Sequence, residues 1–257
     1  MDLFQYLFYS TDNIPDGVGF SLFSVGHLAW LTAIVVGIAL ACRQYRQADE
    51  AGRTKMRRVV SALMIADECL KIGVLSAIGY YDASYLPLHL CSINIFVCLW
   101  YTLRPNKMAA EVLYALSIPG ALVALCSPTW VELPFVNLMS FHSFSVHGLL
   151  ILYPMMLLTS GEHRPSIRRV WMPLVFMLVL SPILYVFNTM FDTNFMFLNG
   201  TADNIVLETI ESIVTPRFYI LGLVTLVMIV WFFMYLPWTI MDRKKRTVIE
   251  TEAKKAS

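Results

Sequence analysis

The most constraining feature of this sequence is a series of long apolar segments joined by loops that are alternately rich in Lys and Arg and free of them. A helix needs about 20 mostly apolar residues to cross the hydrocarbon core of a bilayer. Seven segments approach or meet that requirement, which predicts an all-α fold, a seven-transmembrane helix bundle. The segments are 21–42, 59–81, 86–103, 108–127, 135–160, 170–191 and 214–241.

The positions of the basic residues predict the orientation of the bundle. Of the 19 lysines and arginines, only Lys71 and Arg217 lie within or beside an apolar segment. The others occupy the first, third and fifth loops and the tail 242–257. Loops rich in Lys and Arg stay on the cytosolic side. We therefore expect the N-terminus outside the cytosol, and the C-terminus with its basic tail inside it.

The composition excludes several classes of protein. Charged residues make up 14% of the chain and the mean hydropathy is +0.64, whereas soluble domains carry about 25% charged residues. Residues 1–257 are therefore expected to form a single polytopic membrane domain. A net charge of +1 gives no indication of nucleic-acid binding. Phosphate-cradling and dinucleotide motifs and metal-ligand spacings are missing, so the sequence predicts no cofactor and no metal.

Polar residues inside a membrane usually mark a site or a pathway. In the predicted orientation, four of the five histidines lie in the outer half of the bundle, on three different segments. These histidines are His27, His89, His142 and His147. Intramembrane histidines also serve as hydrogen-bond partners between helices, which is the alternative interpretation for each of them.

A charged trio lies near the predicted midplane. Asp67, Glu68 and Lys71 share one helix face, so that the lysine can meet both carboxylates. The remaining negative charge requires another cation, such as a histidinium or Arg217. A structural ion pair is the alternative. Glu111, near the inner end of segment 108–127, is expected to extend toward the cytosolic interface without a specific role.

Cys91 lies near the outer end of segment 86–103, with Asn94 one turn further along. A thiolate beside an imidazole is the minimal apparatus for acyl transfer. Asn94, Ser143 or Arg217 can supply donors to the oxyanion that forms in such a reaction. The alternative is that Cys91 is a small buried hydrophobic residue.

Four motifs along the chain carry a family resemblance. They are FSLFSVGHL at 20–28, LPLHLC at 86–91, the histidine block at 142–148 and TNFMFL at 193–198. In this order they resemble the YwaF-like bacterial integral membrane proteins, which are distantly related to the vertebrate transmembrane protein 164 family. The resemblance implies a seven-span bundle in a bacterial plasma membrane. The vertebrate relatives look like cysteine-dependent phospholipid acyltransferases, which implies Cys91 as the nucleophile with His147 or His142 as its partner.

The outer loop that follows segment 170–191 lacks Lys and Arg up to Arg217 and has apolar residues at 195–198. We expect it to lie in the interface and cap the outer mouth of the bundle, with an ordinary surface loop as the alternative. The residues predicted to bind or support are His27, His89, Asn94, Asp67, Glu68, Lys71, Asn194 and Arg217.

Three functions are compatible with these residues. The first is a lipid-directed acyltransferase or acyl hydrolase that uses a Cys–His pair and has membrane lipids as its partners. The second is a transporter or proton-coupled carrier that uses Asp67, Glu68, Lys71 and the histidines. The third is a non-catalytic binding or accessory membrane protein.

Overall fold

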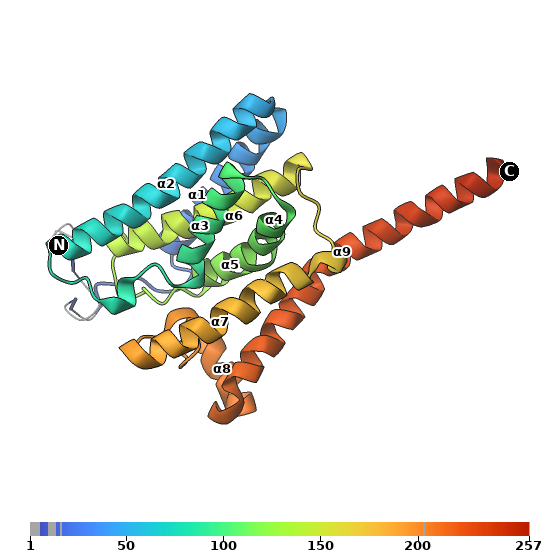
Figure 1. The fold of residues 1–257 in the computed structure, drawn as a ribbon. Helices are drawn as coiled ribbons and strands as arrows, with labels where there is room; N and C mark the ends of the chain where they lie inside the picture. The colour runs from blue at the N-terminus through green and yellow to red at the C-terminus, as the bar shows by residue number, and fades with distance from the viewer. Residues whose placement is uncertain (1–5, 10–13, 16, 203, 257) are drawn as a thin grey trace.

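The computed structural model describes residues 6–9, 14–15, 17–202 and 204–256, which form helices and no strand (Figure 1). The longer helices are α1 (Val25–Gln47), α2 (Glu50–Ala77), α3 (Leu90–Leu103), α4 (Lys107–Val112), α5 (Ile118–Cys126), α6 (Leu138–Ser160), α7 (Trp171–Phe191), α8 (Ile205–Val214) and α9 (Tyr219–Ala256). A π-helical segment, η4 (Leu113–Ser117), joins α4 to α5. Short 3-10 turns lie between other helices, namely η3 (Ala83–Tyr85), η5 (Ile167–Arg169), η6 (Phe195–Phe197) and η7 (Pro216–Phe218).

Every predicted apolar segment overlaps at least one of these helices. Within the described residues, five helical segments are long and apolar enough to cross a membrane. They are Val25–Gln47, Lys107–Cys126, Leu138–Ser160, Ile167–Phe191 and Pro216–Lys244. The other two predicted spans differ: α2 is long but carries several charges, and α3 is apolar but has only 14 residues. The all-α prediction is therefore confirmed, while the count of seven crossings stays a prediction.

Helix α6 lies at the centre of the main helix body, where it packs against α1, α2, α3 and α5. Its sequence is apolar around the whole circumference, which is typical of a helix surrounded by other helices. Phe144 and Tyr153 on α6 are accordingly fully buried. The side chain of Asn137 caps the start of α6, and Gly161, with a φ of 80°, ends it.

The connections between helices gather at two ends of the molecule. The basic end comprises residues 43–58, 104–107 and 161–170, and the opposite end comprises residues 78–89, 127–137 and 192–218. In Figure 1 the α1–α2 turn, the connection from α6 to α7 and the C-terminus lie toward the right. The ends of α2 and α7 lie toward the left. The alternation of basic and non-basic loops in the sequence thus becomes a separation in space.

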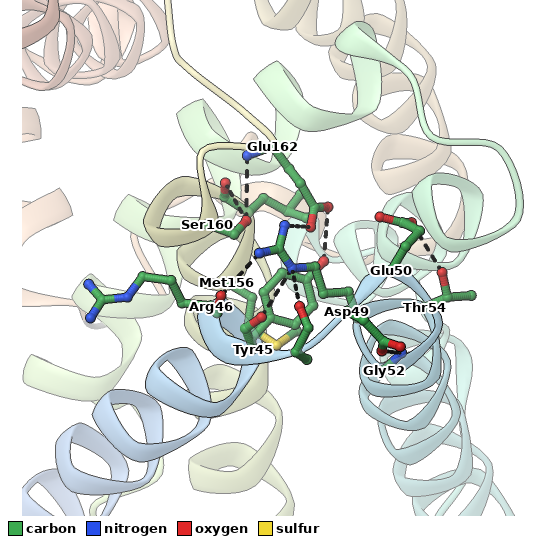
Figure 2. Close-up of polar contacts among 12 residues, drawn as sticks. Tyr45, Arg46, Asp49, Glu50, Gly52, Thr54, Met156, Ser160 and Glu162 are labelled. Carbon is green, nitrogen blue, oxygen red and sulfur yellow. Dashed lines mark hydrogen bonds and ion pairs between the residues drawn. The ribbon is translucent and has the colours of Figure 1, made fainter.

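A network of ion pairs closes the basic end around α1, α2 and α6. Figure 2 shows Tyr45 and Glu162 at its centre, with the Tyr45 hydroxyl donating to Glu162 Oε2 at 2.9 Å. Arg57 Nη1 donates to the same carboxylate oxygen at 2.6 Å, and Arg53 Nη1 lies 3.4 Å from Glu162 Oε1. A hydrogen bond from Arg57 also lowers the pKa of the Glu50 carboxyl. These contacts hold the first turn of α2 and the end of α6 together.

Helices α7 and α9 join the main body through the halves nearest the basic end. Phe176 of α7 and Trp231 and Tyr235 of α9 pack on the hydrophobic core, whereas no described residue of 178–226 belongs to it. The indole Nε1 of Trp231 donates to the Ala115 carbonyl at 2.8 Å. Figure 1 shows α7 and α9 meeting near the basic end and diverging toward α8.

The predicted basic tail 242–257 continues α9 as a helix to Ala256. This part of α9 projects from the bundle at the C-terminus in Figure 1.

Candidate functional site

A cavity of about 1130 Å³ lies between the main helix body and the diverging helices α7 and α9. Helices α2, α3, α5 and α6 form one side of it, while α7, α9 and the 3-10 turn η6 form the other. Five of the predicted site residues line this single space, namely Lys71, His89, Cys91, His142 and His147. The structure therefore brings together most of the outer-half polar residues that the sequence places on separate segments.

The wall of the cavity is mainly apolar, with its titratable groups concentrated on one side. Lys71 and the three histidines are basic, and no Asp or Glu lines the space among the described residues. The facing helices α7 and α9 contribute apolar residues such as Val186 and Val224, and α5 adds Val123. The cavity thus has a polar wall and an apolar wall, a polarity that matches an amphipathic ligand.

Cys91 is the second residue of α3, two positions after the helix N-cap residue His89. The His89 side chain makes no capping hydrogen bond to the helix, and the first backbone bond within α3 is from Ile93 N–H to the His89 carbonyl, at 3.0 Å. The preceding N–H groups at the start of a helix have no partner within the helix. Backbone donors are therefore available beside the Cys91 thiol.

His147 presents one ring nitrogen to the cavity. Its Nδ1 lies 2.6 Å from the Ser143 carbonyl oxygen, which can only accept, so Nδ1 carries the proton and Nε2 keeps a lone pair. The imidazole stacks on the indole of Trp130 at a centroid distance of 5.5 Å and an interplanar angle of 10°. Trp130 was not among the predicted site residues. Its ring and the Ser143 carbonyl fix the orientation of a base that faces the same space as Cys91.

The thiol and the imidazoles share the cavity without touching. Within the described part of the chain, Cys91 Sγ has no hydrogen-bond partner, and the bonds of His147 and His142 go elsewhere. Catalytic hydrogen bonds are often long or unformed before substrate binds. The arrangement places a thiol, an imidazole and backbone N–H groups of a helix start around one space.

His142 has two carboxylates as neighbours. Its Nδ1 lies 3.0 Å from Asp67 Oδ2 without the alignment of a hydrogen bond, and its Nε2 lies 3.9 Å from Glu68 Oε2. Lys71 Nζ donates to Glu68 Oε1 at 2.5 Å. Lys71 thus meets one carboxylate of the trio, and the His142 ring lies beside both carboxylates, where the sequence predicted an additional cation.

The sequence model of the TMEM164 family matches residues 22–235, a range that includes Cys91 and the four outer-half histidines. The chain belongs to the TMEM164 family. It is therefore a multi-pass integral membrane protein, which the five apolar helices support. Neither a curated protein nor a solved structure matches the chain. The family resemblance carried by the four motifs is confirmed at this level.

In this TMEM164-family protein, His27 is a buried hydrogen-bonding residue that connects two helices. Phe23 N–H donates to His27 Nδ1 at 2.9 Å, and His27 Nε2 lies 2.9 Å from the Leu125 carbonyl oxygen. Both ring nitrogens are satisfied by backbone groups, and the ring is fully buried beside Phe20 and Phe144. His27 does not line the cavity. It connects the start of α1 to the end of α5.

Three other predicted support residues lie outside the cavity wall. Asn94 is buried, and its Oδ1 has no hydrogen-bond partner in the described structure. Asn194 binds within its own loop, with Nδ2 donating to Gly200 O and Oδ1 accepting from Asn199 N–H, both at 3.0 Å. Arg217 is exposed, with its guanidinium 5.8 Å from the ring centroid of Phe218.

His89 and the outer loop meet at the mouth of the cavity. The His89 ring lies edge-on to Phe195 at 5.0 Å and tilted against Phe197 at 5.8 Å. Phe195 is buried, and Phe197 lines the cavity. This placement agrees with the expectation that the segment caps the bundle.

A second buried polar cluster involves Glu111 at the basic end. The Glu111 side chain is fully buried and accepts from Arg169 Nε at 2.5 Å and from the Tyr235 hydroxyl at 2.9 Å. His163 Nε2 lies 3.7 Å from the same carboxylate. The expectation that Glu111 extends toward the interface was wrong, because these partners compensate its charge inside the protein. The cluster ties α4 to α9 and to the connection before α7.

Proposed function

We propose that this TMEM164-family protein is a lipid-directed acyltransferase or acyl hydrolase in which Cys91 is the nucleophile and His147 the base. One observation carries the proposal: Cys91, His147, His142 and His89 line a single large apolar cavity. Pockets for small molecules usually measure about 300–1,000 Å³. A cavity of about 1130 Å³ with an apolar wall has room for acyl chains.

The chemistry follows from the two side chains. His147 Nε2 takes the proton of the Cys91 thiol as the sulfur attacks an ester carbonyl carbon. A carbon–sulfur bond forms, the ester carbon–oxygen bond breaks, and the histidine returns the proton to the leaving alcohol. In the second half of the reaction a lipid hydroxyl or water attacks the thioester, loses its proton to His147 and displaces the thiolate, which is then reprotonated. The acceptor decides between acyl transfer and hydrolysis.

The start of α3 is suited to stabilise the oxyanion. Backbone N–H groups at a helix N-terminus donate to negative charge without reorganisation. The N–H groups of residues 90–92 lie next to the Cys91 thiol. None of them has a hydrogen-bond partner within α3, so all three are free to donate to an oxyanion. They fit this role better than Arg217, which does not reach the cavity.

We place this chemistry in a seven-span protein of a bacterial plasma membrane, with the N-terminus outside and the C-terminus in the cytosol. The separation of basic and non-basic loops at the two ends supports this orientation. The charges of α2 that lie near the midplane are compensated by His142 and by one another, which supports its crossing the bilayer within a bundle.

The proposal is tested by following fatty-acid release or transfer from a labelled phospholipid in proteoliposomes. We expect Cys91→Ala to abolish turnover while the protein remains folded. Cys98→Ala is the matched control, because Cys98 lies on the same helix, is fully buried and does not line the cavity. Turnover that persists in Cys91→Ala would rule out the thioester mechanism.

A proton-coupled carrier is the second candidate, favoured by one observation. The Asp67–His142 and Glu68–Lys71 pairs form a nearly buried charged cluster, of which Lys71 and His142 reach the cavity. This function predicts pH-dependent flux that survives Cys91→Ala and disappears in Lys71→Met. A ligand-induced thermal shift with neither flux nor turnover would instead indicate a non-catalytic binding protein.

A further inference from the structure

We infer that a membrane lipid enters the cavity sideways between the diverging halves of α7 and α9, from the leaflet nearest α8, and that residues 193–198 form the gate. That this lipid is the substrate rests on the proposed function. The route and the gate rest on the geometry alone.

The side of the cavity between α7 and α9 faces outward. Val186 and Tyr185 of α7 and Val224 and Ile220 of α9 line the cavity, yet they are 56%, 50%, 52% and 40% exposed. A wall residue with that exposure is accessible from outside the molecule. All four side chains are largely apolar, and at this depth the surroundings of a spanning helix are lipid chains. An acyl chain can therefore pass between them without meeting a polar barrier.

Toward the basic end α9 is fastened to the main body. There the Tyr114 hydroxyl donates to the Met234 carbonyl at 2.6 Å, and Trp231 Nε1 donates to the Ala115 carbonyl at 2.8 Å. The buried Glu111 cluster lies on the same side. These contacts hold α9 in place at this end, while α7 and α9 diverge toward the opposite end (Figure 1).

The gate is held by a few specific contacts. Asn188 fixes Phe195 by accepting from its N–H at 2.9 Å and donating to its carbonyl at 3.0 Å. The rings of Phe195 and Phe197 then rest against His89. Met196 and Phe197 have φ of 59° and 55°, in the left-handed region that residues other than glycine rarely adopt. Such conformations persist only where surrounding contacts impose them, and they concentrate at ligand clamps and switches.

The polarity of the cavity indicates how the lipid would lie. Lys71 and the histidines on the polar wall suit a head group with hydrogen-bonding oxygens, whereas the α7 and α9 wall suits acyl chains. The occupant we infer is therefore a phospholipid, oriented with its head group toward α2, α3 and α6.

The route is tested with a phospholipid that carries a diazirine in its acyl chain and is confined to one leaflet of proteoliposomes. Protein with Cys91→Ala is used, so that capture is measured without turnover. We expect labelling of peptides lining the cavity on α7 and α9 when the probe is in the leaflet nearest α8. Val186→Trp should reduce that labelling several-fold. Val179→Trp is the matched control on the same helix, 60% exposed but outside the cavity wall.

The gate is tested with Phe195→Ala and, as a second variant, Phe197→Ala. Either should raise the rate of labelling several-fold, while Phe218→Ala, at an exposed position outside the cavity wall, should leave it unchanged. Equal labelling from both leaflets, or equal effects of the two tryptophan variants, would overturn the route. Unchanged rates in folded Phe195→Ala and Phe197→Ala would overturn the gate. Lipid capture without any Cys91 adduct in the unmodified protein would retain the route and refute the proposed enzyme.

Discussion

Two histidines on α6 face the same cavity with different neighbours. His147 has a backbone carbonyl at Nδ1 and a free Nε2, whereas His142 has carboxylates near both nitrogens. The first arrangement leaves a lone pair for proton transfer, and the second places the ring between the carboxylates of Asp67 and Glu68. This difference favours His147 over His142 as the base of the proposed reaction.

The two substitutions should therefore have separate effects. His147→Gln removes the base, and loss of a positioned general base typically lowers the rate by about 10²–10⁴-fold. His142→Gln removes the ring that lies 3.0 Å from Asp67 Oδ2 in a nearly buried polar cluster, so it should lower the free energy of unfolding by about 3 kcal/mol. Turnover of labelled phospholipid measures the effect of His147→Gln, and thermal unfolding in detergent measures the effect of His142→Gln. Full turnover in His147→Gln together with loss in a stable His142→Gln would reverse the assignment.

The sequence could identify the residues around the cavity better than their roles. Depth in the bilayer places Cys91, His89 and His147 near one another, and the structure does the same. His27 meets the same criterion, yet it serves packing. Its partners are backbone groups of Phe23 and Leu125, and one of them lies 98 residues away. A long-range backbone contact of this kind leaves no signal in the pattern of residue types.

At the scale of elements, α8 forms an amphipathic helix that packs along α9 beside the mouth of the cavity. None of its residues is buried. Asn204 caps its start, with Oδ1 accepting from the N–H groups of Val206 and Leu207 at 3.1 and 3.3 Å. Amphipathic helices of this type lie in the membrane interface. Gly222 permits the close packing, because a Cβ there would lie 2.5 Å from Ile210 Cγ2.

Gly222→Leu should accordingly displace α8. Overpacking a tight contact costs about 1–3 kcal/mol, and the displaced helix should become more susceptible to proteolysis. Gly37→Leu on α1 is the control, since a Cβ at that position meets nothing within 4 Å. Limited proteolysis and thermal unfolding in detergent test both variants. Equal effects would show that the contact between α8 and α9 contributes little.

Helix boundaries show what hydropathy detects. Segment 59–81 was predicted from apolar residues, but α2 begins at Glu50, where Asp49 caps it by accepting from Gly52 N–H at 2.8 Å. In the same way α9 continues beyond 241 to Ala256. Hydropathy locates the part of a helix that contacts lipid. Helices extend further wherever caps and residues of high helix propensity allow it.

At the scale of the whole molecule, the basic end and the opposite end imply a defined orientation. We expect a C-terminal green fluorescent protein fusion to be fluorescent, because that reporter folds in the cytosol. Reporter fusions after residue 82 should indicate the outside and those after residue 105 the cytosol. The same result at both loops would contradict the predicted seven crossings, because α3 would then not span the membrane.

The cavity itself could not be predicted from the sequence. It exists because α7 and α9 diverge from the main body, and that divergence depends on contacts such as Trp231 with Ala115 and Glu111 with Arg169. These pairs lie 116 and 58 residues apart in the chain. The apolar segments specify which helices form, while long-range polar contacts decide where space remains between them.

The most direct test is intact-mass spectrometry of the purified protein after incubation with phospholipid, with and without hydroxylamine. A thioester mechanism predicts an acyl adduct that maps to Cys91, is released by hydroxylamine and is missing in Cys91→Ala. The adduct should accumulate when the acceptor is withheld. A folded protein that forms no adduct, with a Cys91 thiol inert to alkylating reagents, would contradict the assignment and favour the proton-coupled carrier.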